Sequence, residues 1–258
     1  MENLEYYLAV AKKAARKAGE WLANGYASFD PLFSKGKHEF YISADVECEK
    51  IYREFLKKET PEIDFFAEEK GGKISDLCWA VDPIDGTSNY RVGVPYFTTQ
   101  ICLLKDDEPV ISVIYNPILG HEFSAQKGKG AFLNGKQIFC SDVEEMGKAL
   151  LIVAKGGSNR RAGEIIARFG DAVRTVRLYG ATSVDLSFQA AGKFDIAINY
   201  GSAIWDYAPG ALLARESGGL VLNFKGEPWT INDNNLVASN KYLMPKVLEI
   251  IKQMPQAS

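Results

Sequence analysis

The stretch "WAVDPIDGTSNY", Trp79 to Tyr90, holds two aspartates three positions apart, with proline and isoleucine between them and glycine and threonine after them. Asp82 and Asp85 repel each other when both are ionised, so placing them this close costs free energy. A bound cation or a shared proton would remove that cost. The neighbouring sequence indicates whether a cation or a shared proton is expected.

Further carboxylates end the strands predicted around this stretch. The segments "IDFFAEE" (residues 63–69) and "LCWAVD" (residues 77–82) are typical of short buried strands, and each finishes in acidic residues. Ligands in α/β proteins usually bind where strands end, so Glu68, Glu69 and Asp82 converge if the two strands are neighbours. Hard divalent cations relieve the repulsion among such carboxylates, and a site rich in oxygen ligands and water suits Mg²⁺.

The turn after the first aspartate adds features of a phosphate site. Pro83 is expected to end the strand, so that the turn re-aims Asp85 and leaves the Ile84 carbonyl facing the cation. Gly86 permits a tight turn that exposes successive backbone N–H groups, which can cradle a phosphate, and Thr87 adds a hydroxyl. The dipeptides "DP" and "DG" are also common in simple turns. The "AEE" segment upstream favours the functional interpretation.

The composition indicates a globular protein that acts on a small molecule. The 258 residues, 47% of them hydrophobic, suffice for one large α/β domain or two closely packed lobes. A net charge of −3 lacks the cationic excess of proteins that bind nucleic acid or anionic membranes. Four scattered cysteines, an amino-terminus threaded with charges and the lack of a long apolar run predict a reduced cytoplasmic enzyme or binding protein. Two histidines leave little for a His-rich zinc site or a Ser/His/Asp triad.

The order of elements predicts mixed α/β layers. Helical spacing of apolar residues predicts helices over residues 4–25 and 43–60, and residues 98–139 have the pattern of an antiparallel meander. The remainder alternates strands, at about residues 149–155, 175–180, 194–200, 219–224 and 235–239, with helices, at about residues 160–169, 183–191, 205–217 and 242–253. We expect a single domain over residues 1–258, with possible lobes 1–142 and 143–258.

Another phosphatase motif of similar composition has to be weighed. Haloacid-dehalogenase-type phosphatases carry D-x-D-G-T after an amino-terminal strand, and the first aspartate is their nucleophile. In this chain the spacing is D-x-x-D-G-T, and the motif lies a third of the way along the sequence. The extra residue changes the direction of the first carboxylate, which disfavours this alternative.

Three separated segments together resemble the signature of one phosphatase family. They are Glu68-Glu69, the run Asp82 to Thr87, and Trp205-Asp206-x-Ala208-x-Gly210. In order and separation they resemble the inositol monophosphatase family of magnesium-dependent, lithium-sensitive phosphatases. The segment "KGKGAFLNGK" (residues 127–136) is also similar, and the resemblance covers nearly the whole chain. It implies a mixed α/β fold, a layered α-β-α-β-α sandwich of the sugar-phosphatase type.

The resemblance implies two to three Mg²⁺ ions held by the carboxylates. The family's metal ligands correspond to Glu68, Asp82, the Ile84 carbonyl, Asp85 and Asp206. Thr87, paired with Asp45, is implied to position or deprotonate the attacking water, and Glu68 shares in catalysis through a third, weaker ion. Glu69 is implied to support the metal ligands without binding a metal ion itself. No covalent phosphoenzyme is expected.

The same resemblance implies which residues contact the substrate, namely Asp85, Gly86, Thr87, Gly180, Ala181, Thr182, Asn199 and Asp206. The phosphate is expected against the Gly86 and Thr87 amides, and "LYGATSVD" (residues 178–185) matches a "GTAA"-like family segment at a helix start. A glycine turn before a capped helix would give the same pattern. Asn199 stands where members that hydrolyse inositol phosphates have a glutamate that holds sugar hydroxyls. An amide is a weaker acceptor than a carboxylate, so catalysis is expected to be intact while inositol as substrate is open.

The sequence therefore predicts a Mg²⁺-dependent phosphomonoesterase, a phosphoric monoester hydrolase with inositol 1-phosphate as the leading substrate. Fructose 1,6-bisphosphate, histidinol phosphate and 3′-phosphoadenosine 5′-phosphate remain alternatives, because relatives use them. A non-catalytic partner in a larger assembly is the alternative of a different class, and the complete set of acids disfavours it. The expected partner is a small phosphorylated metabolite rather than nucleic acid or a membrane, and the family resemblance implies a homodimer.

Overall fold

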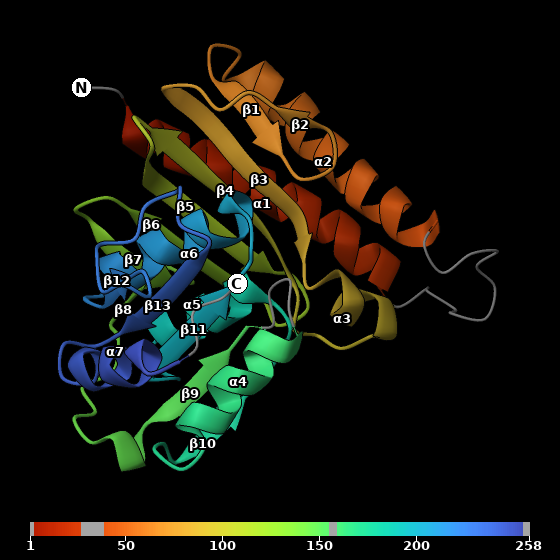
Figure 1. Ribbon diagram of the computed structural model, residues 1–258. Helices are drawn as coiled ribbons and strands as arrows, with labels where there is room; N and C mark the ends of the chain where they lie inside the picture. Colours follow the sequence, from red (N-terminus) through yellow and green to blue (C-terminus); the bar gives the residue numbers. More distant parts are fainter. Residues whose placement is uncertain (1–2, 27–38, 155–158, 255–258) are drawn as a thin grey trace.

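The computed structural model describes residues 3–26, 39–154 and 159–254, which build five alternating layers of helices and sheets (Figure 1). Two helices cover the outer face of one sheet, two lie between the sheets, and two cover the outer face of the second sheet. The α-β-α-β-α sandwich expected from the sequence is confirmed. None of the helices in these ranges is long and apolar enough to cross a membrane.

The first sheet contains the strand that carries the quoted motif. Its strands lie in the order β2-β1-β3-β4-β5-β6-β7-β8. They are β1 (Asp64–Ala67), β2 (Gly71–Gly72), β3 (Leu77–Asp85), β4 (Thr98–Lys105), β5 (Glu108–Asn116), β6 (His121–Gln126), β7 (Gly130–Leu133) and β8 (Lys136–Ile138). The expected meander is present as β4 to β8, all antiparallel. β1 pairs in parallel with β3, with Ala67 opposite Val81, so the acids that follow them lie side by side.

The second sheet is formed by the carboxyl-terminal strands, in the order β10-β9-β11-β13-β12. They are β9 (Leu150–Val153), β10 (Thr175–Arg177), β11 (Ile196–Tyr200), β12 (Leu220–Leu222) and β13 (Asn235–Ser239). β9 pairs in parallel with β10 and β11, whereas β13 is antiparallel to β11 and β12. A short 3₁₀ turn, Met146–Lys148, precedes β9. The predicted lobe boundary near residues 142–147 stays a prediction.

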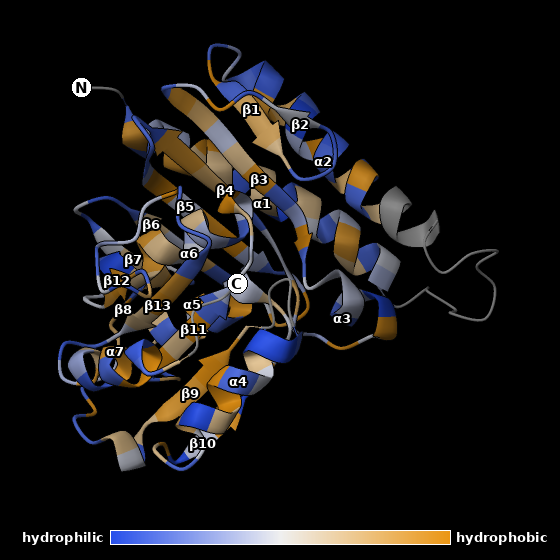
Figure 2. Cartoon of the chain, in the orientation of Figure 1, coloured by the Kyte–Doolittle hydropathy of each residue, from blue (hydrophilic) through white to orange (hydrophobic). Residues whose placement is uncertain are grey.

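Apolar residues on both faces of each sheet account for the layers. The helices are α1 (Leu4–Tyr26) and α2 (Glu39–Glu59) outside the first sheet, α5 (Thr182–Ala190) and α6 (Ile204–Glu216) in the middle, and α4 (Asn159–Phe169) and α7 (Met244–Lys252) outside the second sheet. The short α3 (Thr87–Val92) follows the end of β3. Figure 2 shows hydrophobic residues along the inner strands and hydrophilic ones on the outward side of α4. α2 begins four residues before the predicted start, since no proline or glycine interrupts residues 39–43.

The end of β3 differs from the sequence-based expectation. Pro83 does not end the strand, which continues to Asp85. Asp82 pairs with Gln100 and Asp85 with Thr98 of β4, so β3 carries one extra residue, a β-bulge. Proline fits there because a bulge leaves a residue outside the regular hydrogen-bond ladder. Side chains three positions apart on a regular strand point to opposite faces, and the extra residue turns both carboxylates to the same side.

The two middle helices approach each other closely at Gly210 of α6. A Cβ atom added at Gly210 would lie 2.4 Å from Cδ1 and 2.6 Å from Cβ of Leu186 on α5. Both distances are shorter than side-chain carbon atoms tolerate without movement of a helix. The glycine in the W-D-x-A-x-G segment therefore permits close packing of α5 against α6, which sets the distance between the two sides of the site described below.

We expect Gly210→Ala to lower the free energy of unfolding by about 1–3 kcal/mol, since the added methyl group overpacks a closed interface. Thermal or denaturant unfolding followed by circular dichroism measures the change. Gly163→Ala is the matched control. Gly163 is an exposed glycine of α4 with no atom within 4 Å of its added Cβ, and alanine there should raise stability slightly. Equal unfolding midpoints for wild type and Gly210→Ala would contradict this packing role.

Candidate active site

Three aspartates from two parts of the chain meet where the first sheet faces α6. One carboxylate oxygen each of Asp82, Asp85 and Asp206 lies within 4.8 Å of the others. The first two stand at the bulged end of β3, and the third lies in the first turn of α6. Asp85 and Asp206 border a cavity of about 430 Å³, lined also by Glu68 and by the segments 180–182 and 201–203, and Asp82 lies behind them. The structure thus brings together acids that the sequence places far apart.

Asp82 is the most deeply buried of these acids, with 1% of its surface exposed. Its Oδ1 accepts the Ile84 N–H at 3.0 Å, and its Oδ2 accepts the Gln100 amide at 3.1 Å. Burial, followed by the charges of Asp206 and Asp85, raises the pKa of Asp82 well above its usual value. The two hydrogen bonds fix the carboxylate without supplying a compensating positive charge.

Glu68 and Asp206 extend the acidic group toward the cavity. Loss of surrounding water, then the charge of Glu69, raises the pKa of Glu68 to about 7. Burial, then the charge of Asp85, raises the pKa of Asp206 to about 7, although its Oδ2 accepts the Ala203 N–H at 2.8 Å. Among the described residues that line the cavity there is no lysine or arginine. The donor set, oxygen only, crowded and without a protein cation, fits a hard divalent cation.

Asp85 is held by the start of α5, and burial raises its pKa. Its Oδ1 accepts the Thr182 N–H at 3.2 Å, while its Oδ2 accepts the Ser183 N–H at 2.5 Å and the Ser183 hydroxyl. These bonds, together with the positive end of the helix dipole, partly offset the cost of burying the carboxylate. The Thr182 N–H, which the sequence assigned to substrate, is therefore engaged by Asp85.

Asp45 lies on α2 with 4% of its surface exposed. Burial, then the charges of Glu69 and Glu68, raises its pKa to about 8. It thus stands beside the acidic turn after β1. The hydroxyl of its predicted partner Thr87, however, donates to the Ile84 carbonyl at 2.9 Å. In this arrangement the Thr87 hydroxyl donates its one proton to a backbone carbonyl rather than to Asp45.

Gly86 has the positive φ of 84° that favours glycine, and it stands directly before α3. A Cβ atom there would lie 2.9 Å from Cβ of Ala181 and 3.0 Å from the Tyr96 carbonyl oxygen. Any other residue would therefore be strained in its backbone and would clash with the segment that carries Ala181. Gly86 lets the loop after β3 and the loop before α5 touch, which closes this side of the cavity.

Asn199 is the predicted residue that the structure keeps away from the cavity. It lies on β11 with none of its surface exposed, and it is absent from the residues that line the cavity. Neither its amide nitrogen nor its amide oxygen has a hydrogen-bond partner among the described residues. Gly201, Ser202 and Ala203, which follow it, form that part of the wall instead. The predicted contact of Asn199 with a sugar stays a prediction, and its side chain does not reach the cavity in this arrangement.

Comparison with known proteins accounts for this geometry. The sequence profile of the Inositol monophosphatase family matches residues 3–256. The chain belongs to the inositol monophosphatase family. Members are phosphoric monoester hydrolases that act on small phosphorylated substrates, which agrees with the acidic cavity. The chain is 33% identical to "Inositol monophosphatase 2" of Solanum lycopersicum, over 97% of this chain and 99% of that protein.

Two other relatives carry different names. The chain is 33% identical to "Fructose-1,6-bisphosphatase/inositol-1-monophosphatase" of Aquifex aeolicus, over 98% of both proteins. It is 30% identical to the crystal structure of the extragenic suppressor protein suhB from Bartonella henselae, with a TM-score of 0.86 over 96% of this chain and 99% of the other. The family therefore shares one fold across proteins with more than one recorded name.

Glu49, which supports the turn that carries Glu68, was not predicted from the sequence. Glu49 of α2 has a fully buried side chain whose Oε2 accepts the Glu69 and Lys70 N–H groups at 3.0 and 3.1 Å. It also pairs with Arg53 at 2.6 Å, so it holds the turn that carries Glu68. In the sequence it looks like one half of an ordinary i, i+4 surface ion pair. No local signal distinguishes it from such a pair.

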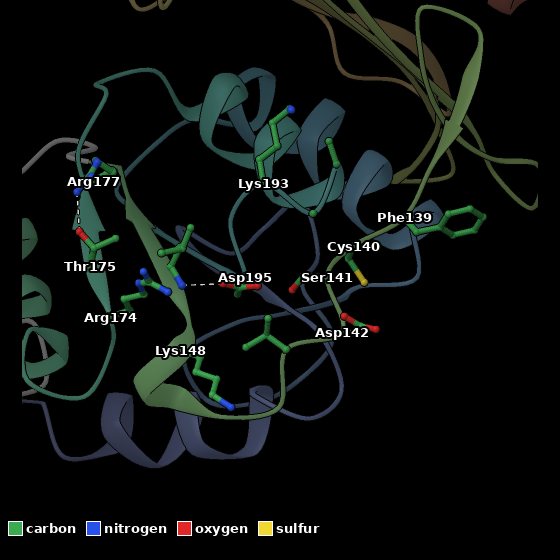
Figure 3. Close-up of a pocket in the computed structure, with 14 residues that line it drawn as sticks. Phe139, Cys140, Ser141, Asp142, Lys148, Arg174, Thr175, Arg177, Lys193 and Asp195 are labelled. Carbon is green, nitrogen blue, oxygen red and sulfur yellow. Dashed lines mark hydrogen bonds between the residues drawn. The ribbon is translucent and has the colours of Figure 1, made fainter.

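A larger groove of about 1010 Å³ lies elsewhere, between residues 139–143 and the strands β9 and β10 (Figure 3). It holds none of the predicted site residues. Its cationic side chains are Lys148, Arg174, Arg177 and Lys193. Lys148 pairs with Glu145, Arg177 bonds Thr175, and Figure 3 shows Lys193 and Lys148 pointing in opposite directions. These charges do not converge on one point, so the acidic cavity is the better candidate despite its smaller volume.

The raised pKa values predict an unusual pH dependence for the metal-free protein. Carboxyl groups of the unfolded chain ionise near pH 4, whereas Glu68 and Asp206 keep their protons to about pH 7 and Asp45 to about pH 8. The folded state then binds more protons between these limits, so the free energy of unfolding falls as pH rises from about 4 to 8. We expect the melting temperature in excess chelator to fall over this window and Mg²⁺ to restore it most at the alkaline end.

Differential scanning calorimetry at several pH values, with chelator and with Mg²⁺, measures both effects. Asp195→Asn is a control for burial alone, since Asp195 is 5% exposed and bonds the Leu150 N–H away from the acidic cavity. A melting temperature in chelator that rises from pH 5 to pH 8 would contradict the electrostatic account.

Proposed function

We propose that the chain is a Mg²⁺-dependent phosphomonoesterase that hydrolyses a small polyol or sugar phosphate, with inositol 1-phosphate as the leading substrate. The observation that carries the proposal is the cluster of Asp82, Asp85 and Asp206 beside Glu68, at a cavity with no basic lining residue in the described ranges. Glu68, Asp82, the Ile84 carbonyl, Asp85 and Asp206 are the proposed ligands. Divalent cations held there would offset the charge of the phosphate and activate water for attack.

The chain's own groups would orient the substrate and manage the proton. The N–H groups of Gly86 and Thr87 stand at the start of α3, where backbone donors favour a phosphate. Asp45 is buried beside Glu69 and Glu68 and would take a proton from the attacking water. Thr87, whose hydroxyl donates to the Ile84 carbonyl, would direct that water. Water attack leaves no phosphate on the protein, and Asp82 acts as a ligand rather than a nucleophile.

Substrate selectivity is proposed to be weak. The glutamate expected for inositol phosphatases is Asn199 here, and its amide is buried behind the cavity wall. Recognition then rests on the phosphate and on the backbone of Gly180 and Ala181, which many phosphate esters can satisfy. The relative from Aquifex aeolicus, named for both fructose-1,6-bisphosphatase and inositol-1-monophosphatase, supports this breadth. A homodimer and inhibition by millimolar lithium, which the family resemblance implies, are part of the proposal. So is the cytoplasmic location predicted from the cysteines and the charged amino-terminus.

The acids are tested by Asp82→Asn and Asp206→Asn. Each should lower kcat/KM by on the order of a thousandfold, because removing a ligand forfeits about 4 kcal/mol of transition-state stabilisation. Phosphate release from inositol 1-phosphate with and without Mg²⁺ measures the effect, and Asp195→Asn serves again as the buried control that keeps activity. Full activity in excess chelator would refute the metal mechanism, whereas no phosphate release from any tested ester in the presence of Mg²⁺ would favour the non-catalytic role.

Selectivity is tested by the charge and length of the residue at position 199. We expect the wild type to hydrolyse inositol 1-phosphate within about tenfold of glycerol 2-phosphate. An ionised glutamate cannot stay unpaired in the fully buried site of the Asn199 amide and would have to turn toward the cavity. Asn199→Glu should then raise the preference by roughly tenfold, the value of one charge-assisted hydrogen bond. Asn199→Gln has the same length without the charge and should leave the ratio unchanged. A wild type that already prefers inositol 1-phosphate by more than about a hundredfold would show that another residue recognises the sugar.

A further inference from the structure

Ser183, the second residue of α5, makes a contact that the family resemblance does not imply. Its side chain is fully buried. The hydroxyl lies against Oδ2 of Asp85 and 2.6 Å from Oγ1 of Thr98. Asp85 and Thr98 are paired across β3 and β4, so the hydroxyl joins the end of the first sheet to the start of α5.

The direction of these hydrogen bonds follows from the groups involved. An ionised carboxylate can only accept, so the Ser183 hydroxyl donates to Asp85. The Ser183 oxygen is then free to accept, and the Thr98 hydroxyl donates to it. Thr98 is itself 2% exposed, so no bulk water competes for these bonds. Two hydroxyls in series therefore act on one carboxylate oxygen, and bonds arranged in series strengthen one another.

The donors are distributed unequally over the two oxygens of Asp85. Oδ2 accepts two short bonds, from the N–H and the hydroxyl of Ser183, whereas Oδ1 accepts the longer bond from the Thr182 N–H, at 3.2 Å. The Gly86 N–H also lies close enough to favour the ionised carboxylate. A carboxylate oxygen has about two lone-pair directions. Oδ2 is therefore saturated, and Oδ1 keeps one direction for another partner. Rotation of the carboxylate would break all three bonds.

We propose that Ser183, supported by Thr98, is a positioning residue that holds Asp85 so that Oδ1 is the oxygen offered to a divalent cation. The inference rests on the proposed function, since it needs a cation at Asp85. It concerns a residue to which the family resemblance assigns no role. Ser183→Ala removes only the hydroxyl and alanine favours helix, so the variant should fold.

The test is a direct measurement of cation binding. Isothermal titration of the metal-free protein with Mg²⁺, without substrate, gives a dissociation constant that does not depend on turnover. We expect Ser183→Ala to weaken Mg²⁺ binding by about tenfold, as loss of a group that orients a ligand commonly does. Thr98→Val should weaken it in the same direction. The double variant should bind no more weakly than Ser183→Ala, because Thr98 acts only through Ser183.

Ser187→Ala is the matched control. Ser187 lies one turn further along α5, is 1% exposed, and its hydroxyl has no hydrogen-bond partner in the described part of the chain. It should leave Mg²⁺ binding unchanged. Unchanged binding in Ser183→Ala, or an equal loss in Ser187→Ala, would overturn the inference while leaving the proposed function in place. A wild type that binds no Mg²⁺ would instead refute the proposed function. If Ser183→Ala does not fold, Thr98→Val carries the same test.

Discussion

The structure depends on the burial of like charges where its two sheets face each other across the middle helices. Asp82, Asp85 and Asp206 lie within 4.8 Å of one another, and the pKa of each is raised. Hydrogen bonds from Gln100, the start of α5 and the start of α6 orient them but supply dipoles rather than charge. Protein interiors tolerate buried carboxylates where these are paired, bound to a metal or neutralised by a proton, and the crowded oxygen donors of this group suit a divalent cation.

Rigid packing around this group explains why five layers are needed. The first sheet is packed on both faces, against α1 and α2 on one side and against α5 and α6 on the other. The second sheet is likewise packed on both faces, which fixes the two middle helices in position. Gly210 and Gly86 allow close approaches that larger residues would prevent, one between helices and one between loops. The carboxylates are thus held by backbone N–H groups and by the buried side chains of Gln100 and Ser183.

Much of the fold and of the acidic cluster was predictable, because local sequence patterns indicate it. The order of strands and helices, the neighbouring ends of β1 and β3, and the acids Glu68, Asp82, Asp85 and Asp206 follow from apolar periodicity and from three short motifs. The bulge did not follow, because Pro83 was expected to end a strand, whereas pairing with β4 carries the strand through it. Tertiary pairing overrode a local signal there.

The supporting contacts were not predictable for a related reason. Glu49 and Ser183 are ordinary helix residues in the sequence, and their roles arise from what the fold places opposite them. Asn199 is the opposite case. Its distance from Asp206 along the chain predicted a place in the cavity, but its side chain is buried on β11. Spacing along the chain identifies a residue, whereas its exposure is decided by packing against α5 and α6.

The position of Asp206 in the chain has a consequence for how the protein acquires its fold. Glu68, Asp82 and Asp85 lie in or directly after strands of the first sheet, whose last strand is complete at Ile138. In the chain, α5 follows only after two strands of the second sheet, and α6 after three. Until both helices dock, Asp85 lacks its backbone donors and the cluster lacks Asp206. A nascent chain that ends before α6 therefore carries an incomplete set of ligands. The free energy of cation binding is available only to the finished fold, so a cation would stabilise the product of folding without assembling on its early intermediates.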